Sequence, residues 1–440
     1  MKVLKFGGTS VGSAQRIQDV AKLIAGERNI VVLSAMSGTT NSLVEISDYL
    51  YKKNPDGANE IINRLAMKYY DHVEALYHTP EYKQKAKELI KTHFDHIRTF
   101  TKDIFTLFEE RVILAQGELI STGMMNLYLQ EQGINSVLLP ALDYMRTDKN
   151  AEPDPVYIKE KLSKLLEENK NADLFITQGY ICRNAYGEID NLQRGGSDYT
   201  ASLIGAAIAA EEIQIWTDID GMHNNDPRIV DKTAPVRNLH FEEAAELAYF
   251  GAKILHPTCI LPAKLNNIPV RLLNTMEPEA PGTLISNATE KGKIKAVAAK
   301  ENITSIKIKS GRMLLATGFL RKVFEIFENY QTPIDMVTTS EVGVSVTIDN
   351  RKHLEEIIDD LKKFGTVTVD SDMVIVCVVG DMDWENIGFE ASIVQALKNI
   401  PVRMISYGGS NYNVSLLIKA DDKKKALQAL SDHLFNNPTV

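Results

Sequence analysis

The sequence has few cysteines and no long apolar run, and both shortages limit what the protein can be. Its three cysteines, Cys182, Cys259 and Cys377, lie far apart and form no CxxC pattern, which argues against a disulfide framework and against a zinc site. No stretch approaches the length of a membrane span, and the N-terminus becomes glycine-rich at Gly7, too early for a signal peptide. We therefore expect a protein of the reducing cytoplasm.

Positive charge is also in short supply. The 440 residues include 49 Lys and Arg against 58 Asp and Glu, which gives a net charge of -9. Neither nucleic acid nor an anionic membrane is therefore an expected partner. The length and the 44% of hydrophobic residues fit two or three globular domains. Any phosphate that the protein binds must be held by a local arrangement of residues.

From the N-terminus to Val270, short β-branched runs alternate with helical segments, a pattern typical of a parallel sheet covered by helices. The charged segment Asn41–Glu131 is too long for one crossover, so we interpret it as a helical insertion that caps one end of the sheet. The expected strands are Val3–Phe6, Asn29–Ser34, Ser136–Pro140, Asp173–Tyr180, Ile213–Asp218 and Pro269–Leu273.

Beyond Glu277–Thr283, which two prolines and a glycine mark as a turn or linker, the pattern becomes βαββαβ. Its expected elements are strands Thr304–Lys309, Ile334–Thr338, Gly343–Ile348 and Thr366–Val369 with helices Gly318–Asn329 and Lys352–Phe364. A second copy comprises strands Val374–Val379, Val402–Ser406 and Asn413–Ile418 with helices Phe389–Lys398 and Asp421–Leu434. This copy lacks a last strand, which Ile294–Ala298 could supply.

The first motif with chemical potential is Lys5-Phe-Gly-Gly-Thr-Ser, where an expected strand meets a helix that starts near Ser13. Because Gly7 and Gly8 have no Cβ, their backbone can approach phosphate oxygens closely, and a helix N-terminus favours negative charge. A plain tight turn is the alternative. The motif is not a Walker A loop, because Ser13 stands where that motif has lysine.

Two further segments carry polar residues next to an expected strand or helix. A second glycine pair follows Arg194, whose guanidinium could bind a carboxylate, while Ser197 or Asp198 could simply cap the next helix. The strand Ile213–Asp218 runs into an acidic loop that ends at Arg228. This loop does not have the spacing of a calcium-binding EF-hand, and loops at the carboxyl ends of parallel strands are where α/β folds bind nucleotides.

Seven segments occur in the order found in aspartate kinases, members of the amino acid kinase superfamily, which the chain resembles over essentially its whole length. They are Lys5–Ser10, Ser34–Asn41, Gln116–Leu119, Arg194–Thr200, Trp216–Asp218, Asp226–Arg228 and Phe250–Pro257. The resemblance implies an α/β protein with the three-layer αβα amino acid kinase fold and a mainly parallel sheet, followed by two α+β ACT domains. The implied domains are residues 1–285 (catalytic), 303–372 (first ACT) and 294–301 plus 373–440 (second ACT).

This resemblance implies that the protein uses MgATP to phosphorylate the β-carboxylate of L-aspartate. Lys5 would be catalytic by stabilising charge on the transferred phosphoryl group, and Asp198 would either orient Lys5 or complete the substrate pocket. Mg²⁺ would be held mainly by the phosphates of ATP, and no separate metal site is expected. The implied ATP-binding residues are Lys5, Gly7, Gly8, Thr9, Thr217, Asp218, His223, Asp226, Arg228 and Lys253.

For aspartate, the resemblance places Glu118 at the ammonium group and Arg194 at the α-carboxylate, with Thr40, Ser197 and Asp198 completing the pocket. Taken alone, Glu118 could be a solvated helix residue and Arg194 part of a surface ion pair. The chain departs from its relatives at Gln193, where glycine is usual, and at His223, where tyrosine is usual.

Met313–Leu320 and Asp335–Glu341 resemble the effector-binding segments of lysine-inhibited aspartate kinases. We therefore expect feedback inhibition by an amino acid, with lysine favoured over threonine, and a dimer or tetramer formed through the ACT units. Phe319 and Leu320 could equally be the buried face of a helix. The candidate effector contacts are Met313, Gly318, Phe319, Leu320, Asp335, Thr339 and Ser340.

Two other functions remain to be weighed. A kinase acting on glutamate or acetylglutamate would share the superfamily, but the tandem ACT units and Phe250–Lys253 argue against it. An inactive amino-acid sensor is disfavoured because Lys5, Glu118, Arg194 and Asp198 are all present. A fused homoserine dehydrogenase is not expected, because no residues follow the second ACT unit.

Overall fold

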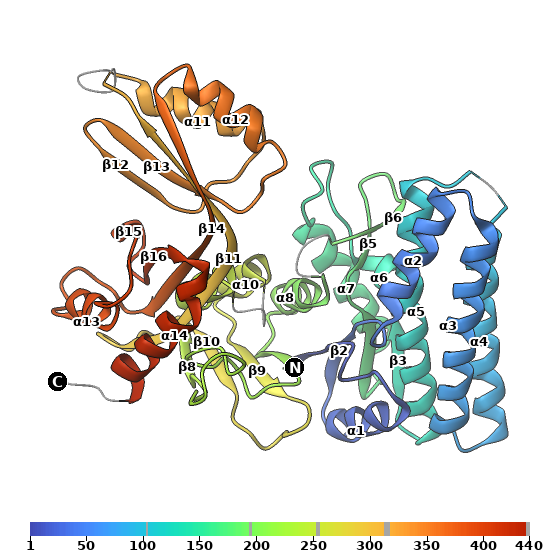
Figure 1. Cartoon of the computed structure of the whole chain (residues 1–440). Helices are drawn as coiled ribbons and strands as arrows, with labels where there is room; N and C mark the ends of the chain where they lie inside the picture. Colours follow the sequence, from blue (N-terminus) through green and yellow to red (C-terminus); the bar gives the residue numbers. More distant parts are fainter. Residues whose placement is uncertain (103, 193–195, 252–255, 312–316, 437–440) are drawn as a thin grey trace. The chain divides into compact units, whose positions relative to one another are not determined.

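The computed structural model describes residues 1–102, 104–192, 196–251, 256–311 and 317–436. The chain divides into two compact units, which Figure 1 shows coloured along the sequence. The first unit comprises Met1–Met222 and Ile254–Asn287, and the second comprises His223–Lys253 and Ala288–Val440. Within the described residues, no helix is long and apolar enough to cross a membrane.

The first unit is built on a sheet with the strand order β3-β4-β2-β1-β7-β9-β10. All neighbouring strands in it are parallel except β10, which runs antiparallel to β9. The six parallel strands are those expected from the sequence, to within a residue or two. The strands are β1 Val3–Phe6, β2 Asn29–Leu33, β3 Ser136–Leu139, β4 Leu174–Gln178, β7 Ile213–Thr217, β9 Val270–Asn274 and β10 Thr283–Ser286.

Helices cover both faces of this sheet, which explains why its strands are almost continuously apolar. Leu4, Val31 and Ile176 belong to a core shared with helices α1 to α5. Residues with the opposite alternation, such as Val3 and Lys5, point to the other face, where α8 contacts β1, β2 and β7 and is flanked by α7 and α10. The helices are α1 Ala14–Ile24, α2 Thr39–Tyr51, α3 Pro55–Leu76, α4 Pro80–Thr99, α5 Leu107–Glu131, α6 Ala141–Tyr144, α7 Pro155–Glu168, α8 Gly196–Ile208 and α10 Pro257–Leu265.

The long helical insertion is confirmed, but its expected place at one end of the sheet is not. Helices α2, α3, α4 and α5 pack side by side (Figure 1), and α5 lies against β2, β3 and β4. Their buried residues merge with those of the sheet into one core. The insertion therefore covers a face, because its helices present enough apolar side chains to bury the strands beneath them.

Parallel pairing brings the carboxyl ends of β1, β2, β4, β7 and β9 to one edge of the sheet. The chain leaves β2 for α2, on the face covered by α1 to α5, whereas it leaves β4 for α8 on the opposite face. Neighbouring strands whose connections go to opposite faces leave a crevice at their carboxyl ends, which is where ligands of α/β proteins bind.

The second unit contains a six-stranded sheet in the order β12-β13-β11-β14-β16-β15. Helices α11 and α12 pack on one half of this sheet, and α13 and α14 pack on the other. Its strands are β11 Ile294–Lys309, β12 Val337–Ser340, β13 Gly343–Ile348, β14 Thr366–Gly380, β15 Met404–Ser406 and β16 Asn413–Lys419, and the short β8 Asn238–His240 also belongs to this unit. Its helices are α9 Phe241–Tyr249, α11 Phe319–Asn329, α12 Leu354–Lys362, α13 Phe389–Ala396 and α14 Lys423–Ser431.

Two pairs of expected strands are single long strands in the structure. Ile294–Ala298 and Thr304–Lys309 both belong to β11, and likewise β14 spans both Thr366–Val369 and Val374–Val379. The register between β11 and β14 shifts after Lys300, and Asn302 and Asp372 adopt positive φ values of 60° and 56°. Such bulges bend a strand without ending it. The first part of β11 pairs with Ile375–Gly380 and so supplies the strand that the second repeat lacks.

The close packing of α5 generates a prediction about two of its glycines. A Cβ at Gly117 would lie 2.7 Å from the Ala35 Cβ, whereas at Gly123 it would meet the flexible end of Leu89. Alanine gains about 1 kcal/mol of helix propensity at either position, but overpacking a site that cannot yield costs about 1–3 kcal/mol. We expect Gly117→Ala to lower the thermal midpoint and Gly123→Ala to leave it unchanged or raise it. Equal midpoints for the two variants would contradict this account of the packing.

Candidate active site

Lys5 and Asp198 form an ion pair at the centre of the first unit. The Lys5 Nζ lies 2.7 Å from the Asp198 Oδ1, and the two side chains are 11% and 17% exposed. Lys5 projects from β1 and Asp198 from the first turn of α8. This geometry supports the expectation that Asp198 orients Lys5, because a carboxylate at this distance fixes where the ammonium group lies.

The loop after β1 is held against the loop after β2. A Cβ at Gly8 would lie only 2.6 Å from the Ala35 carbonyl oxygen, and the Ser37 N–H donates to the Gly8 carbonyl at 3.1 Å. Only glycine fits this close approach of two backbones. The Gly7 N–H donates to the Trp216 carbonyl at 3.4 Å, which continues the pairing of β1 with β7.

A pocket of about 490 Å³ opens at this edge of the sheet. It is bounded by the N-terminal ends of α2 and α8, helices of 13 residues each, and their backbone dipoles favour an anionic ligand there. Among the sequence-predicted residues, Gly8, Thr9, Thr40, Glu118 and Ser197 line it together. The complete lining is Gly8, Thr9, Ser34, Ala35, Met36, Ser37, Gly38, Thr40, Asn41, Glu118, Tyr180, Gly196 and Ser197.

Glu118 is a buried carboxyl group in the wall of this pocket. It lies on α5 and is 5% exposed, and its Oε1 accepts a hydrogen bond from the Ala35 N–H at 3.2 Å. Burial raises the pKa of Glu118 from its ordinary value of 4.5 to about 7, although the hydrogen bond acts in the opposite direction. The solvated helix residue that the sequence alone left open is therefore excluded. A cation that entered the pocket would stabilise the charged form.

Serine hydroxyl groups connect the elements around the pocket. The Ser34 Oγ donates to the Ser197 Oγ at 2.8 Å, which links the end of β2 to the start of α8. The Ser121 Oγ, one turn after Glu118 on α5, donates to the Ser34 carbonyl at 2.8 Å. Gly179 makes room for this arrangement, because a Cβ there would lie 2.3 Å from Ser197.

Tyr180 lines the pocket and was not predicted from the sequence. It has a φ of 67°, which is rare for an aromatic residue and is held only where the surroundings impose it. Here the Tyr180 N–H donates to the Thr200 Oγ1 at 2.9 Å, and its carbonyl accepts from the Leu192 N–H at 2.7 Å. Burial raises the pKa of Tyr180 to about 12, and the nearby Glu118 carboxylate acts in the same direction. Its place at the end of the predicted strand Asp173–Tyr180 was the one available signal.

The remaining predicted ATP contacts are divided between the two units. In the first unit, Thr217 ends β7 and the exposed Asp218 follows it. In the second unit, the His223 Nδ1 lies 2.9 Å from the Thr233 Oγ1. Arg228 binds Asp226 through both carboxylate oxygens, at 2.9 and 2.8 Å, and so lowers the pKa of Asp226. Arg194 and Lys253, together with Gln193, lie outside the described residues.

The predicted effector contacts belong to the second unit, except that Met313 lies outside the described residues. Gly318 caps α11 with a φ of 83°, Phe319 is buried in the core beneath that helix, and Leu320 is 38% exposed. Thr339 and Ser340, on the edge strand β12, are exposed. The alternative that these two residues form the buried face of a helix therefore holds for Phe319 but not for Leu320.

Asp335 is the one predicted effector contact with a buried carboxylate. It lies 2.7 Å from the Lys300 ammonium and is 1% exposed. It also accepts a hydrogen bond from the Tyr249 hydroxyl at 2.9 Å. Lys300 makes a second ion pair, with Asp349 at 2.9 Å, and its ammonium lies 4.4 Å from the centre of the Tyr249 ring. Burial raises the pKa of Asp335, while Lys300 opposes the shift.

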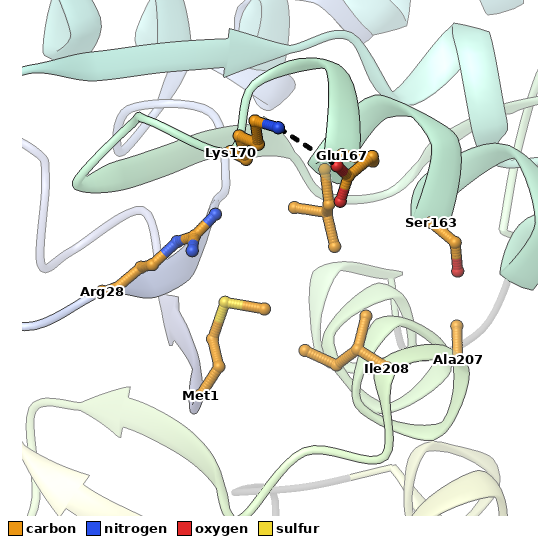
Figure 2. Close-up of a pocket in the computed structure, with 8 residues that line it drawn as sticks. Met1, Arg28, Ser163, Glu167, Lys170, Ala207 and Ile208 are labelled. Carbon is orange, nitrogen blue, oxygen red and sulfur yellow. Dashed lines mark ion pairs between the residues drawn. The ribbon is translucent and has the colours of Figure 1, made fainter.

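A second pocket of about 580 Å³ lies at the opposite edge of the same sheet (Figure 2). Met1 and Arg28 reach it from positions just before β1 and β2, and Ala207 and Ile208 from the end of α8. Its ion pair, between Lys170 and Glu167 at 3.6 Å, joins two exposed side chains. None of the predicted site residues lines this pocket, and we assign no chemistry to it.

Comparison with known proteins adds an independent observation. The model of the amino acid kinase family matches residues 1–274, and an ACT domain model matches residues 376–434. Lysine-sensitive aspartokinase 3 of Escherichia coli strain K12 is 32% identical over 450 residues, which span 98% of this chain and 99% of that protein.

Solved structures of E. coli aspartokinase III resemble the whole chain. The complex with aspartate and ADP, in the R-state, has a TM-score of 0.85 at 31% identity and covers 99% of this chain and 100% of that one. The complex with lysine and aspartate, in the T-state, has a TM-score of 0.81 at 32% identity and covers 99% of each chain.

The raised pKa of Glu118 predicts how stability depends on pH. On unfolding, the carboxyl group returns to a pKa near 4.5 from about 7, so between these values the folded state binds the proton more tightly. Its contribution to the free energy of unfolding therefore falls as the pH rises through this window, by up to about 3 kcal/mol. In Glu118→Gln this fall should disappear, and the variant should be the more stable protein at pH 8. Thermal midpoints from pH 5 to 8 that run parallel in the two proteins would refute the shift.

Proposed function

We propose an activity from the premise that this chain belongs to the aspartokinase family: it transfers the γ-phosphate of ATP to the β-carboxylate of L-aspartate. The product is 4-phospho-L-aspartate, and the reaction is the first step in making lysine, threonine and methionine. One observation carries the proposal. A single pocket is lined both by the Gly8–Thr9 loop and by the buried carboxyl group of Glu118, as a site that holds phosphate beside an amino acid requires.

The reaction must bring two anions together, and Lys5 addresses that difficulty. Two unit charges 4 Å apart repel by about 4 kcal/mol at an effective dielectric constant of about 20. Lys5 supplies a fixed positive charge that Asp198 orients at 2.7 Å, and the N-termini of α2 and α8 add partial positive charge. In phosphoryl transfer, positioning and electrostatic stabilisation account for most of the catalysis.

Aspartate itself is a zwitterion and needs one anchor of each sign. In our proposal, Glu118 binds its ammonium group and Arg194 binds its α-carboxylate, while Thr40 and Ser197 contact the substrate from the N-termini of α2 and α8. Burial destabilises the ionised form of Glu118. Binding of the substrate's ammonium group stabilises that form, so the destabilisation is offset only when substrate is bound.

ATP, in this proposal, contacts Thr9 and Thr217. The residues that could bind Mg²⁺ fit an ion that is held mainly by the phosphates of ATP. Asp218 directly follows β7 and is exposed, and Mg²⁺ usually takes only one or two carboxylates in addition to substrate phosphates. When bound, the ion neutralises phosphate charge.

We further propose feedback inhibition by lysine, as the name and the lysine complex of the E. coli relative suggest. The contacts of Asp335 with Lys300 and Tyr249 support a route for this inhibition within the second unit. An effector ammonium group that binds Asp335 competes with Lys300 and with the hydrogen bond from Tyr249. Tyr249 directly precedes Phe250–Lys253, and Gly251 is pressed against β11, where a Cβ would lie 2.3 Å from the Ala299 carbonyl. A change at Asp335 can therefore be passed through Tyr249 to Gly251.

The division into a catalytic domain at residues 1–285 and two ACT domains remains part of this proposal. So does assembly into a dimer or tetramer through the ACT domains, whose edge strands β12 and β15 each have only one neighbour in the sheet and could pair with another copy. A reducing cytoplasm suits the three cysteines, which are all buried free thiols.

The proposed reaction can be tested by the choice of acceptor. We expect ADP release from MgATP with L-aspartate, little release with L-glutamate or acetylglutamate, and loss of nearly all turnover in Lys5→Ala. The control is Arg28→Ala. This substitution alters the second pocket, at the opposite edge of the sheet, and should retain activity. Turnover with glutamate but not aspartate would overturn the assignment, and near-normal turnover in Lys5→Ala would remove Lys5 from the mechanism.

The proposed regulation can be tested by substituting Asp335 and Asp349, the two carboxylates that pair with Lys300. Asp335→Asn should raise the lysine concentration for half-inhibition by at least about tenfold, since hydrogen bonds and ion pairs to a charged group contribute about 1.5–3 kcal/mol. Asp349→Asn is the matched control, because it removes the other partner of Lys300, which is 40% exposed, and should change half-inhibition much less. Equal effects of the two substitutions would argue that only the charge around Lys300 matters.

A further inference from the structure

The chain between the end of β2 and the first turn of α2 forms one wall of the pocket. More than half of the lining residues lie within Ser34–Asn41. The start of α2 has no side-chain cap of its own, because its N-cap residue is Gly38, with a φ of 81°. Serine, threonine, aspartate and asparagine usually fix this position through a side-chain oxygen. The place of the helix start must therefore be set by neighbouring elements.

Two consecutive residues of α3 bind this helix start. The Lys68 Nζ donates to the Ser37 carbonyl at 2.9 Å. The Tyr69 hydroxyl and the Thr39 Oγ1 lie 2.8 Å apart and share a hydrogen bond. Because Ser37 and Thr39 flank Gly38, α3 holds the chain on both sides of the residue that has no side chain.

The bond between Tyr69 and Thr39 also fixes α2 relative to α5. Both residues are 1% exposed. On its other side Thr39 packs against α5, where a Cβ at Gly117 would lie 3.3 Å from the Thr39 Cγ2. Gly117 directly precedes Glu118, so Thr39 lies between Tyr69 and the turn that carries the proposed ammonium anchor. Burial raises the pKa of Tyr69, and the nearby Glu118 carboxylate acts in the same direction, so the hydroxyl group keeps its proton.

Neither Lys68 nor Tyr69 lines the pocket, whereas Thr40, the residue after Thr39, does. A hydrogen bond between two buried hydroxyl groups adds little net stability, because folding exchanges it for hydrogen bonds with water. It does have a direction, which an apolar contact lacks. Its main effect is therefore to select one position for the start of α2, and with it the position of Thr40 relative to Glu118.

We propose that Lys68 and Tyr69 are positioning residues for the amino-acid substrate. They hold the start of α2 at the place where Thr40 and Glu118 contact the same substrate molecule. This inference rests on the proposed function, which assigns Thr40 and Glu118 to aspartate. It gives Lys68 and Tyr69 no contact with ATP.

The test measures KM for aspartate and KM for ATP separately in Tyr69→Phe and Lys68→Met. Each substitution should raise KM for aspartate by about fivefold or more, since a small displacement of a positioning group has a large effect, while KM for ATP stays within about twofold. Tyr69→Phe removes only the hydroxyl and keeps the ring, whose centre lies 5.9 Å from that of Phe94. Lys68→Arg keeps the charge and the N–H donors and should retain most of the affinity for aspartate.

Thr39→Val checks the hydroxyl pair from its other side. It should raise KM for aspartate about as much as Tyr69→Phe, and the double variant should show no larger rise than either single variant, because both substitutions break one bond. If a single variant does not fold because a buried hydroxyl group is left without a partner, the double variant removes both groups and carries the test.

Two matched controls lie on the same helix or at its end. Arg64→Met breaks an ion pair with Glu45 of α2, at 3.2 Å, and so removes a contact between α2 and α3 that lies away from the helix start. Tyr77→Phe breaks a buried hydrogen bond to the Met124 carbonyl, at 2.7 Å. Both controls should leave both KM values unchanged, although Tyr77→Phe should change the thermal midpoint about as much as Tyr69→Phe.

Unaltered KM for aspartate in Tyr69→Phe, or KM for both substrates rising together, would overturn the proposal. A rise in Lys68→Met alone would overturn it too, because the ammonium group would then act through its charge and not through the position of α2. The acceptor of the wild-type protein is established first. Turnover with a different amino acid would defeat the proposed function, while the two positioning residues would still be judged by KM for that acceptor.

Discussion

Electrostatic repulsion between two anionic reactants is the constraint on which the first unit depends. The parallel sheet meets it by ending several strands at one edge, where Lys5 and the N-termini of α2 and α8 concentrate positive charge. A lone buried ammonium group would be costly to desolvate. Asp198, in the first turn of α8, offsets that cost at 2.7 Å, whereas the first turn of α2 has no acidic residue that would oppose its dipole. The site is therefore prepared for anions before any arrives.

In the proposed function the opposite problem exists at Glu118, where a negative charge is needed only when the ammonium group of the substrate is bound. Burial keeps the pKa of this carboxyl group at about 7 in the empty pocket. A large part of the population is then neutral and avoids the full desolvation penalty. Binding of a cation shifts the group to its charged form, so the interaction is strongest in the complex. The hydrogen bond from the Ala35 N–H orients the carboxyl group but does not by itself keep it ionised.

The sequence predicted those features that have a local signature. Six β-branched runs became the six parallel strands, whose carboxyl ends lie together at one edge of the sheet. Thr40, Glu118 and Ser197 were expected in one pocket from the family resemblance, not from the pattern of strands. The short hairpin of β5 (Ile181–Arg183) and β6 (Ile189–Asn191) was missed because its strands have three residues each, too few to show an alternation. The continuity of β11 was missed because a bulge looks like a strand end. Tyr180 depends on a contact with Thr200, 20 positions away in the sequence, which no periodicity reveals.

In the second unit, the main feature is the net charge of the residues around Lys300. Lys300 faces two carboxylates, Asp335 and Asp349, so the cluster carries one negative charge more than its lysine can neutralise. An amino-acid effector with a cationic side chain is complementary to that excess, whereas a neutral effector is not. A ligand shifts a conformational equilibrium only by the difference in its affinity for the two states. In the proposed regulation the effector therefore meets a different Asp335 in each state, and Tyr249 provides the difference. Its hydroxyl either donates to that carboxylate or releases it to the incoming ammonium group.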